Sequence, residues 1–212
     1  MAGKAALKAF LLRHGEAVGN VRGGYYGRTD CPLTSAGRLV AMQAGEALRM
    51  ALQAEPAREI LLLSSPLQRA RETAVIVQRM AGLPGKIVLE PAWEEIDFGT
   101  WEGRNFADLQ REDPAACQQL CDDWQNFCYP QGESFRQFSQ RVIAAWQKWR
   151  AYADKRQAHM VVVSHGGVLK VIRLWEEGRS WEDFWRIRIA LGEMQSLSLV
   201  ADFPEKTAYG RT

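Results

Sequence analysis

The chain has 212 residues, of which 47% are hydrophobic and 25% charged, so its composition is that of an ordinary globular protein and excludes disordered and low-complexity chains. Its 27 basic and 25 acidic side chains give a formal net charge of +2. This balance argues against nucleic acid or a membrane surface as a partner, because proteins of those classes usually carry a clear basic excess. The three histidines are too few for a histidine-rich metal centre, and no metal or other cofactor is expected.

The cysteines and the apolar runs indicate where the protein works. None of the four cysteines belongs to a Cys-x-x-Cys pair, so neither a zinc ribbon nor a thioredoxin-type motif is supported. Unpaired cysteines of this kind favour a reducing compartment. No run approaches the roughly 18 apolar residues that a membrane span needs, and the N-terminal segment lacks the cleavage site of a signal peptide. The sequence predicts a soluble, cytoplasmic protein.

Apolar strands and amphipathic helices alternate along most of the chain. The strands are expected at residues 6–12, 59–64, 86–89, 159–164 and 197–200, and the helices between them at about 34–54, 66–81, 134–152 and 167–175. The strands are apolar throughout, which is typical of a sheet that is covered on both faces. The sequence therefore predicts an α/β fold, a three-layer α/β/α sandwich with a mainly parallel central sheet.

Residues 92–133 interrupt this alternation. They contain a polar helical stretch that is broken at Pro114, and we expect them to form a helical, lid-like insertion over the sheet. No internal repeat and no long linker divides the chain. Residues 1–212 are therefore predicted to form a single domain.

Arginine and histidine recur where three of the predicted strands end. Arg13 and His14 follow the first strand, Arg69 comes shortly after the second, and His165 follows the fourth. Because ligands of an open α/β sheet bind beyond the carboxyl ends of its strands, we expect these side chains to converge on one pocket. Guanidinium groups match the oxygens of a phosphoryl group, and the helix start after His165 adds backbone donors. The sequence thus predicts a phosphate site in which Arg13, Arg69 and a cationic His165 surround one anion.

The same residues lie in blocks that resemble a known family. Residues 13–16, Arg-His-Gly-Glu, followed by Asn20, are similar to the signature of the histidine phosphatase superfamily, in its phosphoglycerate mutase-like branch. The resemblance continues in the family's order through residues 26–34, 64–70, 95–103 and 164–167. One Arg-His-Gly would mean little, whereas five ordered blocks are specific. The chain is identified as a member over about residues 7–172.

The resemblance implies a phosphomonoesterase that acts through a covalent phosphohistidine. His14 would attack phosphorus, and it must be neutral to do so, which the positive charges of Arg13 and Arg69 favour. Arg13, Arg69 and His165 would bind the phosphoryl oxygens and stabilise the charge that develops on the transferring group. The residues implied to bind substrate are Arg13, Asn20, Arg69, His165 and Gly166, and those implied in catalysis are His14, Glu95, His165, Arg13 and Arg69.

Two adjacent carboxylates compete for the role of general acid and base. Aligned on residues 97–99, Asp-Phe-Gly, the family's glutamate stands four residues before the glycine, which selects Glu95 over Glu94. Neighbouring residues of an extended segment point in opposite directions, so only one of them should face the pocket. Glu95 would protonate the departing ester oxygen and then take a proton from the attacking water.

The chain departs from the mutases of this branch. Ala17 stands where many of them carry a small hydroxyl residue, and residues 103–132 are rich in acidic side chains, which suit a bisphosphate poorly. Hydrolysis is therefore favoured over mutase chemistry. Residues 95–103 and 130–135 resemble those of the α-ribazole-5′-phosphate phosphatases of cobalamin lower-ligand assembly. The expected partner is thus a small phosphate ester, and the expected substrate is α-ribazole 5′-phosphate.

Several alternatives stay open. A broad-specificity phosphatase shares much of the same pattern, a cofactor-dependent phosphoglycerate mutase has the same core residues, and an inactive member would only bind a phosphorylated metabolite. A homodimer is also left open. Trp93 and Trp101 flank Glu95 and are considered as an aromatic wall for a substrate ring, whereas His159 lies outside every block and is expected at the surface.

Overall fold

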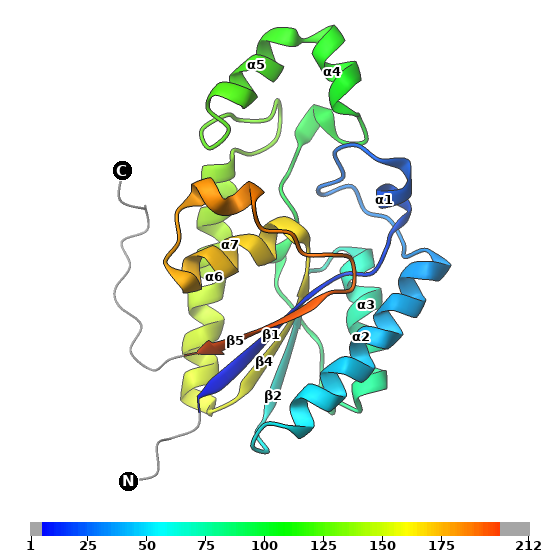
Figure 1. Ribbon diagram of the computed structural model, residues 1–212, viewed down its shortest axis with the longest axis vertical. Coiled ribbons are helices and arrows are strands. Elements are labelled where there is room, and N and C mark those ends of the chain that lie inside the picture. Colours follow the sequence, from blue (N-terminus) through cyan, green and yellow to red (C-terminus); the bar gives the residue numbers. More distant parts are fainter. Residues whose placement is uncertain (1–5, 200–212) are drawn as a thin grey trace.

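The computed structural model describes residues 6–199, and a five-stranded sheet runs through its centre in the order β3-β2-β4-β1-β5 (Figure 1). Its strands are β1 (Leu7–Arg13), β2 (Ile60–Ser64), β3 (Val88–Leu89), β4 (His159–Ser164) and β5 (Met194–Leu199). The first four run parallel, and β5 pairs antiparallel with β1 at the sheet edge. Every residue of β4 is buried, because helices cover both faces of the sheet and strands flank β4 on both sides.

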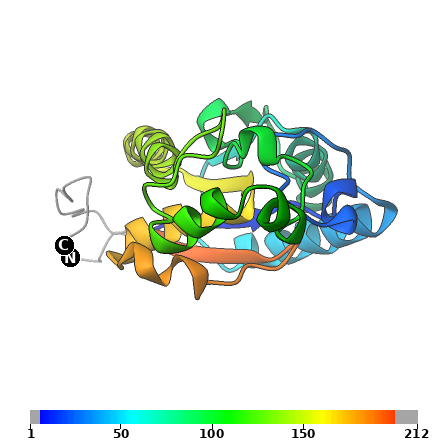
Figure 2. The same ribbon diagram turned by 90° about the horizontal axis from the view of Figure 1, so that it is seen from above.

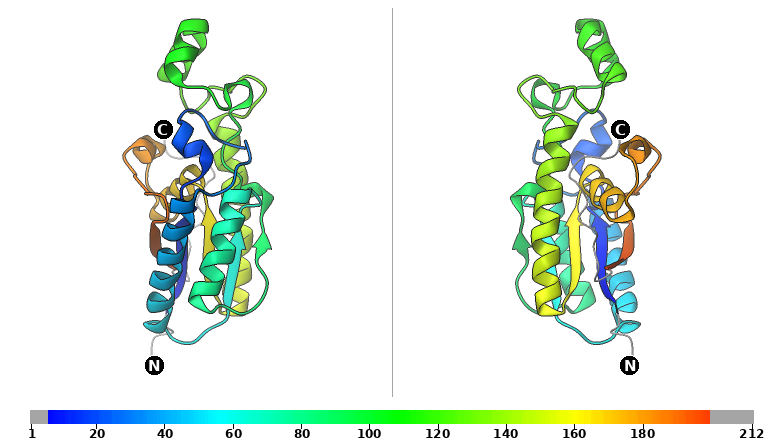
Figure 3. Two further views of the ribbon diagram at one scale, coloured as in Figure 1. Left: turned by 90° about the vertical axis from the view of Figure 1, so that its right-hand side faces the viewer. Right: turned by 90° about the vertical axis from the view of Figure 1, so that its left-hand side faces the viewer.

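Helices form a layer on each face of the sheet. They are α1 (Val18–Arg22), α2 (Ser35–Gln53), α3 (Gln68–Ala81), α4 (Phe106–Glu112), α5 (Pro114–Asp122), α6 (Phe135–Arg156) and α7 (Gly166–Glu177), with short 3-10 turns η1 (Pro91–Trp93), η2 (Gly99–Trp101) and η3 (Trp181–Trp185). Helices α2 and α3 cover one face of the sheet, and α6 and α7 cover the opposite face (Figure 3). One apolar cluster joins each helix pair to the sheet. The predicted α/β sandwich with a mainly parallel sheet is confirmed.

Cap residues in the sequence mark where two of the long helices begin. Thr34 Oγ1 accepts a hydrogen bond from the Gly37 amide at the start of α2, and Ser134 forms a reciprocal capping box with Gln137 at the start of α6. Helix α6 runs four residues beyond the predicted end, to Arg156. Strand β5 begins at Met194, three residues before the predicted start, and the predicted last residue of this strand, at position 200, lies outside the described residues.

Residues 92–133 fold beyond the carboxyl ends of the strands. The polar helical stretch is divided into α4 and α5 at Pro114, as expected from a residue that cannot donate to the preceding turn. Seen from above, these two helices lie across the end of the sheet (Figure 2). The segment has a small apolar cluster of its own, formed by Trp101, Leu109, Cys117, Phe127 and Tyr129. This cluster gives the segment an internal packing that is separate from the two main clusters.

His159 is not at the surface, and that prediction is wrong. Only 1% of the residue is exposed, and its Nδ1 accepts a hydrogen bond of 2.9 Å from the backbone amide of Lys8. The reason is the position of β4 between β1 and β2, which covers even the first residue of the strand. Within residues 6–199, no helix is long and apolar enough to cross a membrane.

Candidate active site

Arg13, His14, Arg69 and His165 meet at the carboxyl end of the sheet. The imidazole rings of His14 and His165 follow the adjacent parallel strands β1 and β4, and their centroids are 5.1 Å apart. A hydrogen bond of 2.9 Å from the His14 amide to the Ser164 carbonyl fixes this register. Arg69 reaches the same place from the first turn of α3 and is only 3% exposed. The predicted convergence of these four side chains is present in the structure.

The ring of His14 is held in one tautomer. Its Nδ1 lies 2.7 Å from the carbonyl oxygen of Gly15. Because a carbonyl can only accept, Nδ1 carries the hydrogen, and Nε2 of the neutral ring keeps its lone pair. Burial lowers the pKa of His14 to about 3, and the charges of Arg69 and Arg13 add to this effect against the opposing Gly15 hydrogen bond. His14 is therefore neutral at physiological pH, with Nε2 free to act as a nucleophile.

Both arginines are oriented by backbone carbonyls. Arg69 donates to the Gly27 and Thr29 oxygens at 2.6 and 3.0 Å, and Arg13 donates to the Ile189 oxygen at 2.7 Å. A carbonyl fixes the guanidinium plane without neutralising its charge. The Nε of Arg13 is buried and has no hydrogen-bond partner among residues 6–199. The two guanidinium groups thus retain their charge for an anion.

His165 is neutral, so the expectation of a cationic ring is wrong. Burial lowers the pKa of His165 well below its usual range, and the positive charge of Arg69 lowers it further. Its Nε2 lies 2.8 Å from Ser65 Oγ, which itself accepts a hydrogen bond from the Leu67 amide. Among residues 6–199 the Ser65 hydroxyl has no other acceptor than Nε2, so its proton points to Nε2 and the hydrogen of the neutral ring lies on Nδ1. This Nδ1 is buried without a partner in the described chain and can donate to a phosphate oxygen.

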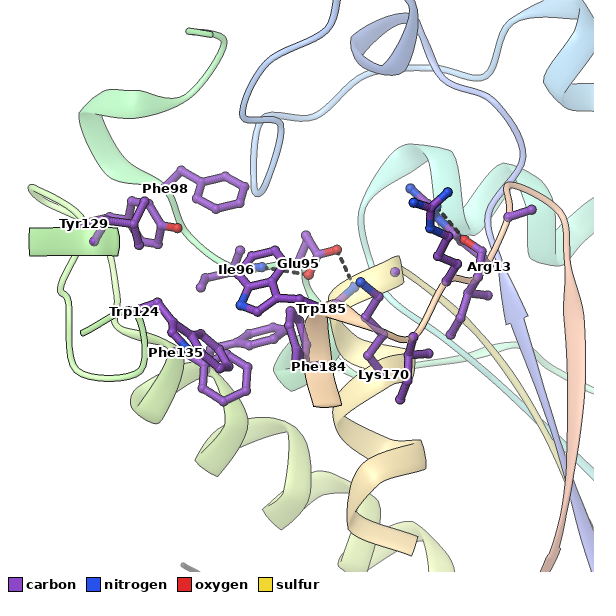
Figure 4. Close-up of a pocket in the computed structure, with 18 of the residues that line it drawn as sticks. Arg13, Glu95, Ile96, Phe98, Trp124, Tyr129, Phe135, Lys170, Phe184 and Trp185 are labelled. Carbon is purple, nitrogen blue, oxygen red and sulfur yellow. Dashed lines mark hydrogen bonds between the residues drawn. The ribbon is translucent and has the colours of Figure 1, made fainter. Parts of the chain in front are cut away.

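The two neighbouring glutamates point in different directions, as their alternation predicts. Glu95 lines the cavity beside Arg13 (Figure 4), and its two carboxylate oxygens accept from the amides of Ile96 and Gly167 at 3.1 and 2.9 Å. Glu94 instead forms an ion pair of 3.2 Å with Arg28. Of the two carboxylates, Glu95 is the one placed to exchange a proton with a bound ester.

Arg141 holds the segment that carries Glu95, a role that the sequence alone did not indicate. Its guanidinium donates to the carbonyls of Ala92, Glu94 and Glu95 at 2.8, 2.9 and 3.0 Å. It also forms a two-pronged ion pair with Glu133, at 2.9 and 2.5 Å. The signal in the sequence was a pair of opposite charges eight residues apart across the start of α6, and such pairs are common on surfaces.

The remaining predicted substrate residues are placed differently. Gly166 lines the cavity, and a Cβ on it would lie 3.3 Å from the Arg13 guanidinium carbon, a tight contact that would press on the guanidinium group. Asn20 is exposed, and its Oδ1 accepts from the Ala17 amide at 2.9 Å, which caps α1. The structure does not bring Asn20 into contact with the four converging side chains, and its contact with substrate stays a prediction.

A cavity of about 630 Å³ lies next to the four converging side chains, of which Arg13 is among its lining residues (Figure 4). One end holds Arg13, Glu95 and the first residues of α7. The walls beyond it are largely aromatic, formed by Phe98, Trp124, Tyr129, Phe135, Phe138, Phe184 and Trp185.

Trp93 and Trp101 do not line this cavity, so the predicted aromatic wall consists of other residues. Trp93 lies in the core and donates through Nε1 to the Val142 carbonyl, and Trp101 belongs to the cluster inside the insertion. Both stand in 3-10 turns that direct their rings into the protein. The actual wall includes η3, an irregular segment with no periodic pattern that would have predicted it.

Comparison with known proteins settles the family. A family model described as the histidine phosphatase superfamily (branch 1) matches residues 9–211. The chain belongs to this superfamily. Over 200 residues it is 33% identical to the adenosylcobalamin/alpha-ribazole phosphatase of Escherichia coli (strain K12), a match that covers 93% of this chain and 92% of the relative.

Two further relatives carry the names of the two competing activities: one is named a phosphatase and the other a probable mutase. The crystal structure of the alpha-ribazole phosphatase from Shigella flexneri aligns with a TM-score of 0.76 and 32% identity over 92% of each chain. A probable phosphoglycerate mutase GpmB of Salmonella arizonae is 34% identical over 139 residues, or 66% of this chain and 61% of the relative. The predicted family is confirmed, and the protein is a phosphatase.

Proposed function

We propose that this phosphatase hydrolyses a small phosphate monoester through a phosphohistidine on His14, with Glu95 as general acid and base. The observation that carries the proposal is the state of His14. Its Nδ1 hydrogen is committed to Gly15, its ring is neutral, and the positive charges of Arg69 and Arg13 act on it. A histidine in this state is an activated nucleophile for phosphorus.

The reaction then has two displacements. In the first, the Nε2 lone pair forms a bond to phosphorus while the ester P–O bond breaks, and the departing oxygen takes a proton from the Glu95 carboxyl group. In the second, the Glu95 carboxylate takes a proton from a water whose oxygen attacks phosphorus, and the P–Nε2 bond breaks. Inorganic phosphate leaves, and both side chains return to their starting states.

The cations and donors of the site act on the phosphoryl oxygens. Arg13 and Arg69 supply fixed positive charge, and His165 supplies a neutral N–H donor through Nδ1. Groups that are already oriented stabilise the transition state without reorganising during the reaction. Asn20 is retained as a further substrate contact, formed when the ester is bound.

The proposed substrate is α-ribazole 5′-phosphate, a ribonucleotide with an aromatic base. Two relatives of about one-third identity are named as phosphatases for this compound. The aromatic walls of the cavity support the assignment, because flat rings pack favourably against aromatic side chains. A broad-specificity phosphatase or a mutase would use the same phosphate site and is distinguished by the substrates it converts.

The test is phosphate release from a metabolite panel that contains α-ribazole 5′-phosphate and 3-phosphoglycerate with its bisphosphate, in buffer with EDTA. Wild type should prefer α-ribazole 5′-phosphate, and His14→Ala should lose at least ~10³-fold in kcat, as expected when a nucleophile is removed. Acid quenching with a labelled ester should trap a phosphoenzyme in wild type only. His159→Asn, which replaces a buried histidine outside the site, is the matched control and should retain activity.

Different results would overturn different parts. Full activity of His14→Ala would exclude the phosphohistidine, and loss of activity in EDTA would exclude a metal-independent reaction. Isomerisation of 3-phosphoglycerate would favour a mutase. The cytoplasmic location and a homodimer remain predictions, and sedimentation equilibrium tests the second of them.

A further inference from the structure

One carboxylate binds the backbone of the loop that follows α1. Glu102 comes directly after the 3-10 turn η2 and is half-buried. Its two oxygens accept hydrogen bonds of 2.9–3.1 Å from three successive amides, those of Gly27, Arg28 and Thr29. The amide of Phe98 adds a further hydrogen bond of 3.3 Å. A carboxylate with this many backbone donors fixes the course of the loop, because rotating any of these peptide groups would break a charge-assisted hydrogen bond.

The carbonyls of the same loop hold Arg69. Its guanidinium donates to the Gly27 oxygen at 2.6 Å and to the Thr29 oxygen at 3.0 Å. Within residues 6–199 these two carbonyls are its only hydrogen-bond acceptors. The residue is 3% exposed, so bulk water contributes little to its orientation. The direction of the guanidinium therefore depends on where the loop carbonyls point.

A single peptide group joins Glu102 to Arg69. The peptide between Gly27 and Arg28 is trans, so its N–H and its C=O point in opposite directions. Its N–H donates to Glu102 at 2.9 Å, and its C=O accepts from Arg69 at 2.6 Å. The negative charge at the N–H and the positive charge at the C=O polarise the peptide in the same sense, so each hydrogen bond strengthens the other.

The loop lies against the segment that carries the general acid. A Cβ at Gly27 would collide with the Ile96 carbonyl and would lie 2.6 Å from Glu102 Oε1, so only glycine allows this close approach. The side chain of Arg28 pairs with Asp97 at 3.1 Å across the same contact. The loop is thus held in place from the side opposite to the phosphate site.

We propose that Glu102 is a positioning residue for Arg69: through the peptide between Gly27 and Arg28 it fixes the carbonyl that orients the guanidinium toward the phosphoryl group. The inference rests on the proposed role of Arg69 in binding the phosphoryl oxygens. A guanidinium that is oriented in advance stabilises the transition state without reorganising, so the loss of Glu102 slows phosphoryl transfer although this side chain does not belong to the phosphate site.

The experiment is a double-mutant cycle between Glu102 and Arg69, measured as kcat/KM for p-nitrophenyl phosphate. Glu102→Gln keeps the shape of the side chain but turns one acceptor into an NH₂ group that faces backbone donors. It should lower kcat/KM about 10- to 100-fold in the wild-type background. In the Arg69→Met background, where no guanidinium is left to orient, it should lower kcat/KM less than about twofold. A role in folding alone would give the same factor in both backgrounds.

Inhibition by inorganic phosphate measures the orientation of Arg69 without the chemical step. The inhibition constant should rise about tenfold in Glu102→Gln, and Glu102→Gln should add nothing to the rise caused by Arg69→Met. If Glu102→Gln does not fold, Glu102→Asp carries the same comparison, because it keeps the charge and withdraws both oxygens by one methylene group.

Glu176→Gln is the matched control. Glu176 lies at the opposite end of α7 from the site, and its carboxylate also binds several donors, from Trp146 and Arg150, at 2.6–2.9 Å. This variant should keep the wild-type kcat/KM and the wild-type inhibition constant for phosphate.

Each result bears on a defined statement. Full kcat/KM of Glu102→Gln, or an equal loss in both backgrounds, overturns the positioning role and leaves the proposed function intact. An inhibition constant that rises as much in Glu176→Gln as in Glu102→Gln also overturns it, because a general loss of stability would then suffice. Wild-type activity of Arg69→Met would contradict the proposed phosphate site and the positioning role together.

Discussion

At the scale of single residues, the site depends on which buried atom carries a proton. His14 and His165 are both neutral, yet their hydrogens lie on Nδ1 for different reasons. A backbone carbonyl fixes the first ring, and the hydroxyl of Ser65 fixes the second. One ring therefore presents a lone pair at Nε2 and the other a donor at Nδ1. The sequence predicted both histidines, but it could not reveal their tautomers, because these depend on how the ring of His14 turns toward the Gly15 carbonyl and on the contact of His165 with the distant Ser65.

Replacing each of the two adjacent glutamates in turn distinguishes the general acid from its neighbour. Glu95→Gln should lower kcat by about 10²–10⁴-fold on an alkyl phosphate, because the departing alkoxide then leaves without a proton. The loss should be smaller on p-nitrophenyl phosphate, whose leaving group needs little protonation. Glu94→Gln, which breaks only the ion pair with Arg28, should retain near wild-type kcat on both. Equal losses in the two variants would contradict the assignment.

Gly167 sets the position of the Glu95 carboxylate. A Cβ at residue 167 would lie 2.3 Å from Glu95 Oε1, the flexible end of a side chain that can swing away. Gly167→Ala should therefore displace the carboxylate and lower kcat by at least about tenfold, while the melting temperature changes little. Steady-state kinetics and thermal unfolding check this together. A variant with full kcat would show that the carboxylate position is not critical.

At the scale of elements, the strands and helices that could be predicted were those with a periodic pattern of apolar residues. The strands and the helices α2, α3, α6 and α7 were predictable because apolar residues repeat at strand or helix spacing and cap residues mark the ends. The convergence of the strand-end residues followed from the parallel order of the strands. The segment between α7 and β5 was not predictable, because its short 3-10 turn and loops have no period. Phe184, Trp185 and Arg188 come from this segment, so its share of the cavity wall, seven of the 19 lining residues, was missed.

Helix α6 also positions the acid from a distance. Arg141 on this helix binds three successive parts of the backbone around Glu95, and Glu133 holds Arg141 in place. Arg141→Met should lower kcat at least about tenfold with little change in KM, and should shift the pH profile of kcat, because the carboxyl group loses its fixed environment. Removing one partner of this partly buried pair also destabilises the fold.

The control for Arg141 is a second buried ion pair on the same helix. Arg150 pairs with Glu176 of α7 at 2.8 Å, far along α6 from the site, and its pair is better covered than the Arg141–Glu133 pair. Arg150→Met should destabilise the protein by at least as much as Arg141→Met and leave kcat and its pH profile unchanged. If both variants changed the profile alike, the effect of Arg141 would be one of stability and not of positioning.

At the scale of the whole molecule, burial of every histidine couples the fold to pH. His14, His159 and His165 are each at most 3% exposed, and burial is the largest cause that lowers the pKa of each one. In the unfolded chain these rings return to a pKa of about 6.5. Below that pH the unfolded state binds protons that the folded state does not, so the free energy of unfolding must fall as the pH falls.

The window follows from the two pKa values of His14. The stability is complete above pH 6.5 and is lost progressively as the pH falls toward the folded value of about 3, at a rate of about 1.4 kcal/mol per pH unit for this ring alone. Urea unfolding between pH 5 and 8 should show a flat region above pH 7 and a steep decline below pH 6.5. Buffers without phosphate are needed, because a bound anion would stabilise the folded state. His159→Gln should reduce the slope without affecting phosphate binding, and a stability that is independent of pH between 5 and 7 would contradict the neutral state on which the nucleophile depends.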